Sequence, residues 1–340
     1  AMSTPKTSCW AAASSWIFSS TSGLGDMICI SGEYYVGHYG NSPTFPPIVR
    51  KLVGSSWQQV GGTVSSSQAN LMEFKYNSNL LYLAFSEGVY NPRLTVKYLN
   101  GSSWSTLGST RFSASSYWSL FLSFGFLGTT PLVAFQDGDS LPWTGISVMR
   151  FNGAWTDVGT PGISPAAGES PSMAIFQSKI YVSYVEFSGN TYTYQLKESN
   201  GVSWTANPYY ISNSAPVLNR GIYKIFLQEN TGYLYAAYVD GSAGDKLTVK
   251  KYDGTSWSVV GAAGFSPEIR QLYGMTVING TPYVAFLHYI ESLDGRGLDV
   301  SVMRFDGTNW NYVGQQGIAN FDLNFAVIRN DGTTPTLAYS

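Results

Sequence analysis

Charged residues are scarce in this chain of 340 residues: they make up only 12% of it, with 19 Lys and Arg against 21 Asp and Glu. This near balance gives no strong electrostatic field, so nucleic acid is not an expected partner. No apolar run reaches the roughly 18 to 20 residues of a membrane-spanning helix. The start, AMSTPKTSCW, lacks the basic and then apolar layout of a secretion signal, which fits a chain without a signal or a mature chain.

Cysteine and histidine are equally rare. Cys9 and Cys29 are too few for a disulfide framework or a metal cluster, and the sequence leaves open whether they form one disulfide or two thiols. His38 and His288 match no HxxxH or HExxH metal motif. The chain also has no nucleophile elbow, phosphate loop, dinucleotide fingerprint or CxxC. No cofactor is therefore expected.

Glycine and tyrosine, by contrast, are plentiful, with 36 Gly and 24 Tyr. Together with many Ser and Thr they suit short strands and tight turns, and long helical stretches of Ala, Glu, Leu and Lys are absent, so we predict an all-β fold. A short motif also recurs, as RFDGTNW at 304–310 and KYDGTSW at 251–257. Weaker copies are KLVGSSW, KYLNGSSW, RFNGAW and KESNGVSW. Such a pattern indicates one structural unit used many times.

The tryptophan that ends each copy gives the length of the unit. These residues recur every 47 to 53 positions: Trp57, Trp104, Trp155, Trp204, Trp257 and Trp310. This length fits four short strands, and the alternating apolar residues with Asn-Gly and Asp-Gly turns predict an antiparallel meander. Each Trp is expected to pack between neighbouring units.

The two ends of the chain complete the pattern. The last unit has only two strands, and the N-terminal segments TSCWAAA and SSWIFSS supply two more, with Trp16 in the equivalent place. We therefore predict one domain, a seven-bladed β-propeller whose ring is closed by a blade shared between the termini. The expected blades are 22–61, 62–108, 109–159, 160–208, 209–261, 262–314, and a composite of 315–340 with 1–21.

The units VMRFDGTNWNYVG and VKKYDGTSWSVVGAAGFS, with TPYVAF and LYAAYVDG before them, resemble bacterial-type propeller repeats of the form YVAY-D followed by KYDGTxWxxVG. The resemblance implies a propeller over nearly the whole chain and favours an extracellular or cell-surface location. The ring of similar blades is also loosely similar to β-propeller lectins, although no lectin signature carries over residue by residue. Sialidase Asp-boxes differ, because here Gly follows Asp directly.

Function is expected on the face that carries the long connections, around the mouth of the central channel. At a common point just after the second strand of each unit stand Glu87, Asp137, Glu186 and Asp240, with His288 in the sixth unit. These side chains either bind a ligand or cap their own loops, as Asp does in turns. The sequence leaves both alternatives open.

Aromatic residues of the same loops suit sugars, whose C–H faces stack on rings. Tyr90, Trp143 and Tyr289 are the candidates, and Trp143 is preferred because it follows Pro in a loop with no equivalent Trp elsewhere. Asp139, in the segment DGDS, completes the predicted ligand site. Calcium is an alternative occupant of this acidic segment and of ESLDGRG at 291–297, although neither matches the twelve-residue calcium loop.

These features favour a carbohydrate-binding, lectin-like propeller that is not an enzyme and whose partner is a glycan or a glycoprotein. The first alternative is a scaffold or adhesion propeller that binds another protein. The second is a polysaccharide lyase or glycosidase with its site at the channel mouth. A glycosidase is the less expected, because a ring of similar acids does not provide one carboxyl of raised pKa beside one of normal pKa.

Overall fold

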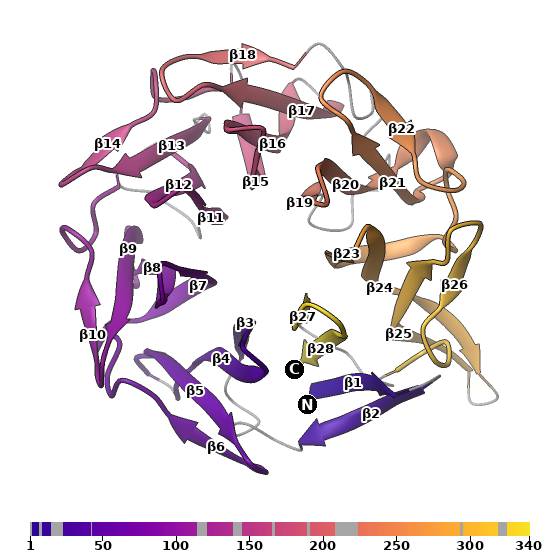
Figure 1. Ribbon diagram of the computed structural model, residues 1–340, viewed down its shortest axis with the longest axis horizontal. Helices are drawn as coiled ribbons and strands as arrows, with labels where there is room; N and C mark the ends of the chain where they lie inside the picture. Colours follow the sequence, from indigo (N-terminus) through magenta and orange to yellow (C-terminus); the bar gives the residue numbers. More distant parts are fainter. Residues whose placement is uncertain are drawn as a thin grey trace.

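The computed structural model describes residues 2–6, 9–14, 23–41, 43–113, 121–138, 145–164, 167–188, 191–207, 224–292, 295–318 and 325–340. Its regular elements are β-strands and one short 3₁₀ helix, η1 (Gly241–Ala243). The strands form antiparallel four-stranded sheets arranged as blades around a central axis (Figure 1). The predicted all-β propeller with four-stranded blades is thus confirmed.

Six sheets each consist of four consecutive strands. The first has β3 (Leu24–Ile30), β4 (Glu33–Tyr39), β5 (Pro47–Val53) and β6 (Ser56–Gln59). The second has β7 (Ala69–Asn77), β8 (Leu80–Glu87), β9 (Arg93–Asn100) and β10 (Ser103–Thr106). The third has β11 (Leu122–Leu127), β12 (Thr130–Gln136), β13 (Ile146–Phe151) and β14 (Trp155–Asp157).

The fourth sheet has β15 (Ala167–Phe176), β16 (Lys179–Ser188), β17 (Thr191–Ser199) and β18 (Trp204–Ala206). The fifth has β19 (Phe226–Asn230), β20 (Tyr233–Asp240), β21 (Lys246–Tyr252) and β22 (Trp257–Val259). The sixth has β23 (Ile269–Ile278), β24 (Thr281–Ser292), β25 (Gly295–Phe305) and β26 (Trp310–Tyr312).

A further sheet joins the two ends of the chain in the order β2-β1-β28-β27. Its strands are β1 (Met2–Lys6), β2 (Cys9–Ser14), β27 (Ala326–Asn330) and β28 (Pro335–Tyr339). Strand β1 pairs with β28 through Met2 opposite Ala338 and Ser3 opposite Leu337. Both ends of the chain thus contribute strands to one sheet.

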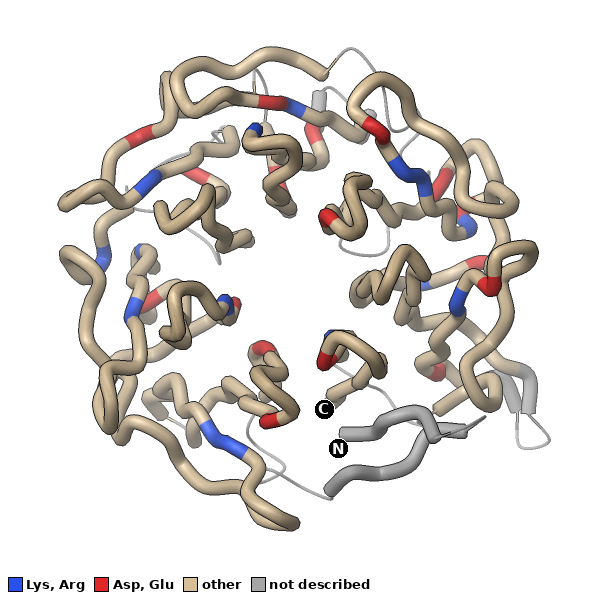
Figure 2. The backbone as a smooth tube through the Cα atoms, in the orientation of Figure 1, with Lys and Arg blue, Asp and Glu red and all other residues tan. Residues whose placement is uncertain are grey.

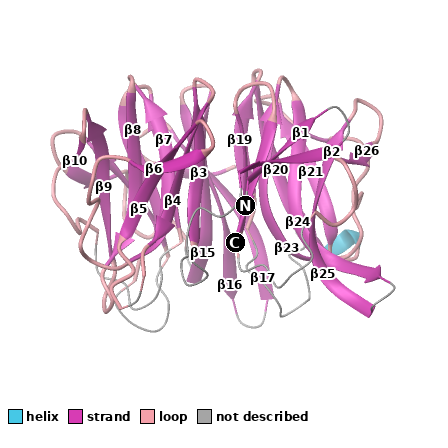
Figure 3. Ribbon diagram, turned by 90° about the horizontal axis from the view of Figure 1, so that it is seen from below, coloured by secondary structure: helices cyan, strands magenta, loops and turns pink. Residues whose placement is uncertain are grey.

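The first strand of each consecutive sheet is the innermost, and β3, β7, β11, β15, β19 and β23 surround the axis together with β27 (Figure 1). Because the strands alternate in direction, the turns between first and second strands lie at one end of the ring, and the second-to-third and blade-to-blade connections lie at the other (Figure 3). The predicted Asn-Gly turn is present at Asn279 and Gly280, which have φ angles of 49° and 79°.

The apolar core lies between neighbouring sheets. One cluster joins Tyr235 and Val249 of the fifth sheet to Val277 and Phe286 of the sixth. Four of the repeated tryptophans link neighbouring blades, because the indole N–H of each donates to a backbone carbonyl of the preceding blade. The pairs are Trp104 to Val60 (3.1 Å), Trp155 to Leu107 (2.9 Å), Trp204 to Val158 (2.6 Å) and Trp310 to Val260 (2.8 Å).

Replacing Trp310 by Phe should lower the free energy of unfolding by about 1–2 kcal/mol, measured by urea denaturation. The variant loses the indole hydrogen bond to Val260 and part of the ring that stacks on Phe265 at 3.8 Å. Trp257→Phe is the matched control, because the indole N–H of Trp257 has no hydrogen-bond partner among the described residues. An equal decrease in the free energy of unfolding of the two variants would show that the indole hydrogen bond does not stabilise the contact between the blades.

The aspartate of the recurring Asp-Gly motif stabilises the turn between the third and fourth strands of its sheet. In the fifth sheet one carboxylate oxygen of Asp253 accepts from the backbone N–H groups of Thr255 (2.7 Å) and Ser256 (2.8 Å). It also accepts from the Thr255 hydroxyl at 2.7 Å. Hydrogen bonds from Thr255 and Ser256 lower the pKa of Asp253 from 3.8 to about 2. The aspartate thus stabilises the turn between β21 and β22.

Asp253 should make the stability of the protein depend on pH. Its pKa is lower in the folded state, so its contribution is present above the ordinary value of 3.8 and is lost as pH falls toward about 2. We expect the melting temperature of Asp253→Asn to lie below that of the wild type near neutral pH and to converge on it through this acidic window. A difference that stays constant with pH would contradict a role for the charge.

Candidate functional site

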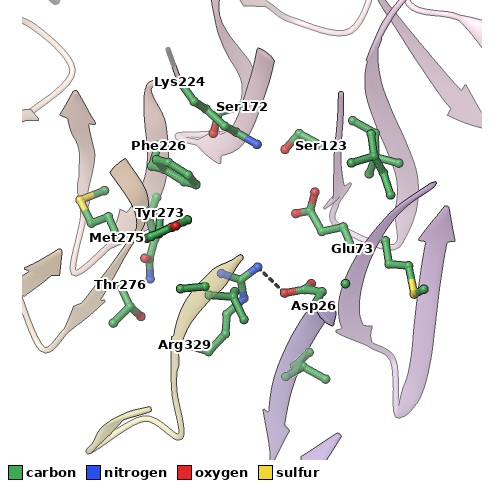
Figure 4. Close-up of a pocket in the computed structure, with 18 of the residues that line it drawn as sticks. Asp26, Glu73, Ser123, Ser172, Lys224, Phe226, Tyr273, Met275, Thr276 and Arg329 are labelled. Atoms are coloured by element: carbon green, nitrogen blue, oxygen red, sulfur yellow. Dashed lines mark hydrogen bonds and ion pairs between the residues drawn. The ribbon is translucent and has the colours of Figure 1, made fainter. Parts of the chain in front are cut away.

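A cavity of about 530 Å³ lies on the axis and is lined by the innermost strands of the sheets (Figure 4). Its wall contains two acids, Asp26 and Glu73, and three bases, Lys75, Lys224 and Arg329. Positions of Lys, Arg, Asp and Glu occur on the inner strands that surround the channel (Figure 2). In a chain with so few charges, five on one cavity wall mark the channel as the candidate site.

Asp26 and Arg329 form one ion pair of this wall. The guanidinium of Arg329, on β27, lies 2.7 Å from a carboxylate oxygen of Asp26, on β3. The other oxygen of Asp26 accepts the backbone N–H of Phe74, on β7, at 2.8 Å. The Asp26 side chain is only 3% exposed, and burial raises its pKa although Arg329 acts to lower it. Asp26 thus connects three neighbouring blades.

Glu73 and Lys75 form the second ion pair, both on β7, with 2.5 Å between the Lys75 ammonium and a carboxylate oxygen. The other oxygen of Glu73 accepts the backbone N–H of Phe124, on β11, at 3.0 Å. Burial acts to raise the pKa of Glu73, but the ammonium groups of Lys75 and Lys224 outweigh it and hold the pKa below its ordinary value. Glu73 is therefore an ionised structural acid.

Two serines, in the third and fourth sheets, likewise accept a backbone N–H of the next sheet. The hydroxyl of Ser123 accepts the backbone N–H of Met173, and that of Ser172 accepts the backbone N–H of Leu227, each at 3.0 Å. Polar side chains of successive inner strands thus each hold the next blade. The channel width is fixed by this chain of contacts, which gives the remaining cavity residues a rigid frame.

Lys224 differs from these residues. It lies two residues before β19 and its side chain points into the cavity (Figure 4). Among the described residues its ammonium has no hydrogen-bond or ion-pair partner, and it lies 5.2 Å from the centre of the Phe226 ring. Burial lowers the pKa of Lys224 from 10.5, with Glu73 acting in the opposite direction. Lys224 is therefore an amine able to accept a proton.

Tyr273, on β23, supplies a second titratable group to the cavity (Figure 4). Its side chain is buried, and burial raises its pKa to about 12. The phenol is thus protonated at any ordinary pH and can donate a proton. The cavity brings together an amine of lowered pKa, a neutral phenol and a guanidinium, which are the groups that general acid–base chemistry requires.

The acids predicted from the sequence as ligand-binding residues form hydrogen bonds within their own blades. Glu87 accepts from the hydroxyls of Ser65 and Thr95, the latter at 2.8 Å. Asp137 accepts from Ser147 at 2.7 Å, and Asp240 accepts from Thr248 at 2.9 Å. Each of these three acids lies in a different sheet, so the structure does not bring them together.

The hydroxyl groups bonded to these acids in turn hold the connection to the next blade. Thr95 accepts the backbone N–H of Arg111 at 2.9 Å, and Ser147 and Thr248 accept those of Gly162 and Gly264 at 2.9 and 3.0 Å. Asp240 also caps its own loop by accepting the backbone N–H of Ser242 at 3.1 Å. Asp240 thus makes the backbone contact of the loop-capping alternative, whereas Glu87 and Asp137 accept from hydroxyl groups, and ligand binding by these acids stays a prediction.

The sequence predicted Glu186 and His288 just after the second strand and Tyr289 in the loop that follows, and these placements are wrong. They lie inside β16 and β24, because the hairpins of the fourth and sixth sheets continue farther: Glu186 pairs with Thr193 and His288 with Asp299. His288 is buried and its Nε2 lies 2.8 Å from the Ser301 hydroxyl. The Tyr289 ring lies 5.4 Å from the Arg270 guanidinium.

Trp143 and Asp139 lie outside the described residues. Tyr90 is described and is 88% exposed. No group of three or more His, Cys, Asp or Glu side chains that could hold a metal ion occurs in the part of the chain that the structure describes. Within that part, no helix is long and apolar enough to cross a membrane.

The sequence analysis missed the cavity residues because it looked only at the loops. The signal was nonetheless present: Asp26 stands in LGDMICI, and Glu73 and Lys75 in LMEFKY, inside first strands that are otherwise apolar. In a propeller the first strand faces the channel. A charged residue within it is therefore a candidate for the channel wall.

No protein-family model matches the chain, and no curated protein matches it. Among solved structures, it is similar to polysaccharide lyase Uly1, with a TM-score of 0.54 and 10% identity over 92% of this chain and 76% of that one. An ulvan lyase of family PL25 gives 0.54 and 10% over 91% and 88%. A prolyl endopeptidase gives 0.53 and 10% over 92% and 45%. At these identities the similarity establishes the propeller fold alone.

Proposed function

We propose that this protein is a carbohydrate-active propeller that cleaves an acidic polysaccharide by β-elimination in the axial cavity. The observation that carries the proposal is Lys224, an amine of lowered pKa that points into the cavity without a partner among the described residues. The fold supports it, because two of the similar structures are polysaccharide lyases. This is the second alternative of the sequence analysis, now located in the channel.

The proposed reaction uses three side chains. The guanidinium of Arg329, held on one side by Asp26, donates hydrogen bonds to the carboxylate of a uronate residue. The neutral amine of Lys224 takes the proton from C5, beside that carboxylate. The electron pair forms the C4–C5 double bond as the C4–O bond breaks, and Tyr273 gives its proton to the leaving oxygen. Proton transfer through water from Lys224 to Tyr273 restores both groups.

A glycosidase fits the cavity less well. Its two carboxyl groups have to be free to act as acid and as base or nucleophile. Asp26 and Glu73 are each engaged in an ion pair and a backbone hydrogen bond. The guanidinium of Arg329, which stays charged, also favours a negatively charged substrate.

Ring closure belongs to the same proposal. We infer that the sheet β2-β1-β28-β27 acts as a seventh blade, which closes the ring and sets Arg329 opposite Asp26. Pairing between the terminal strands would leave no open edge in the propeller. The channel site would then depend on both ends of the chain.

The test is incubation of the full chain with polygalacturonate and with alginate, followed by the ultraviolet absorbance of the unsaturated uronate product. Rising absorbance with either polymer, and none with uncharged dextran, is the expected result. Binding of the polymer without any product would overturn the lyase chemistry and return the protein to the lectin-like interpretation. If neither binding nor product is observed, an acidic polysaccharide is not the ligand of the channel.

A further inference from the structure

The loop between β8 and β9 carries the most exposed aromatic side chain in the described part of the chain. Tyr90 is 88% exposed and its neighbour Val89 is 59% exposed. The corresponding loop of the fifth sheet is instead folded into η1 and contains small and polar residues.

The loop that presents Tyr90 is held in one conformation. Arg111 donates to the backbone carbonyl groups of Glu87 (2.6 Å) and Asn91 (3.0 Å), one on each side of the tyrosine. The backbone N–H of Gly88 donates to the carbonyl of Gln68 at 2.9 Å. Gly88 has a φ angle of 121°, a conformation that other residues rarely adopt, so glycine is favoured there. The exposed ring is therefore preorganised for binding.

The charges beside this ring are positive and lack acidic partners. Neither Arg93 nor Arg111 forms an ion pair with any described residue, and the buried Nε–H of Arg93 has no acceptor among them. The nearby carboxylate of Glu87 is turned toward the hydroxyls of Ser65 and Thr95. The guanidinium groups of Arg93 and Arg111 therefore keep a positive charge without an acidic partner, which favours a negatively charged ligand.

We propose that the 88–93 loop, with Arg111, is a second carbohydrate-binding site, separate from the cavity, that takes an anionic saccharide. A sugar ring stacks on Tyr90, and carboxylate or sulfate oxygens accept from Arg93 and Arg111. A saccharide fits better than an acidic protein, because one ring on a short loop falls far below the roughly 800 Å² per partner of a stable protein interface. This site does not depend on the lyase chemistry, since it needs only binding.

Calorimetric titration of the full chain tests the proposal with dextran sulfate and polygalacturonate as the two anionic saccharides. Uncharged dextran and polyglutamate are the reference polymers. We expect Tyr90→Ala to weaken binding of at least one anionic saccharide about tenfold and Tyr90→Phe to leave it unchanged. Whichever polymer shows the Tyr90 dependence identifies carboxylate or sulfate as the recognised group. Because Tyr90 is so exposed, both variants should melt as the wild type does.

Two further comparisons separate this site from its alternatives. Lys224→Met should keep the Tyr90-dependent binding, because Lys224 lies in the cavity and not on this loop. Arg93→Gln should weaken binding more than Arg304→Gln, which removes the same charge from an exposed position in the sixth sheet. Unchanged affinity of Tyr90→Ala for both anionic saccharides would overturn the proposal. Equal Tyr90-dependent binding of polyglutamate would overturn it too, in favour of an acidic protein partner.

Discussion

Replacing Lys224 by Met should abolish polysaccharide cleavage while the protein remains folded. Methionine keeps the length and apolar stem of lysine but has no amine to take the C5 proton. Loss of a positioned base lowers rates by about 10²–10⁴-fold. The melting temperature should not fall, because the buried ammonium of Lys224 has no partner among the described residues.

Lys75→Met is the matched control, since it makes the same substitution at another lysine of the same cavity. Lys75 is paired with Glu73 at 2.5 Å and has no proposed role as a base, so its loss should reduce kcat much less. The pH profile is a second readout. Burial lowers the pKa of Lys224, so kcat/KM of the wild type should rise with pH and level off below the ordinary lysine value of 10.5. Full activity of Lys224→Met would remove it from the mechanism.

The fold was largely predictable because its signals are local and repeated. Each Asp-Gly or Asn-Gly turn selects its own hairpin, and each Trp follows its turn at nearly constant spacing. Asp253 shows why the turn is so regular: its carboxylate accepts the backbone N–H groups of Thr255 and Ser256, which lie two and three positions farther along the chain. The Trp could be assigned to the seams because one large side chain per unit has to be accommodated by the neighbouring blade.

The site was much less predictable, because its residues come from different blades. Asp26 and Arg329 are 303 positions apart in the chain, and they meet because β27 lies beside β3. Their places in first strands mark them as candidates for the channel wall, but no local pattern pairs one with the other. The loop acids, by contrast, recur at one place in the repeat, and the structure gives that recurrence a structural reason: Glu87, Asp137 and Asp240 each bond a hydroxyl of the adjacent strand.

Repetition is therefore the stronger guide to folding, and departure from it the stronger guide to function. The equivalent inner-strand position is occupied by Asp26 and Glu73 in the first two sheets and by serines in the third and fourth. The serine hydroxyls only accept a backbone N–H of the next blade. Tyr90 likewise has no exposed counterpart among the described second-to-third connections. Both proposed sites lie where one blade differs from the others.

Removing residues 1–21 should destabilise the whole ring and expose a new sheet edge. The truncation takes away β1 and β2, so β28 loses the backbone partner that it has at Met2 and Ser3. An unpaired edge strand promotes association between molecules. We expect the melting temperature to fall by at least about 5 °C, because loss of two strands exceeds the effect of a single substitution. Light scattering should show association that increases with protein concentration.

Adding back residues 1–21 as a separate peptide is the control for this truncation. The peptide should restore the melting temperature if β1 pairs with β28, whereas a scrambled peptide of the same composition should not. Cleavage of the acidic polysaccharide should fall and recover in parallel, because Arg329 is carried by β27 of the same sheet and reaches Asp26 across the seam. A truncated protein that stays monomeric and melts like the wild type would show that the terminal strands do not close the ring, and the channel site would then have to be supported by the other blades alone.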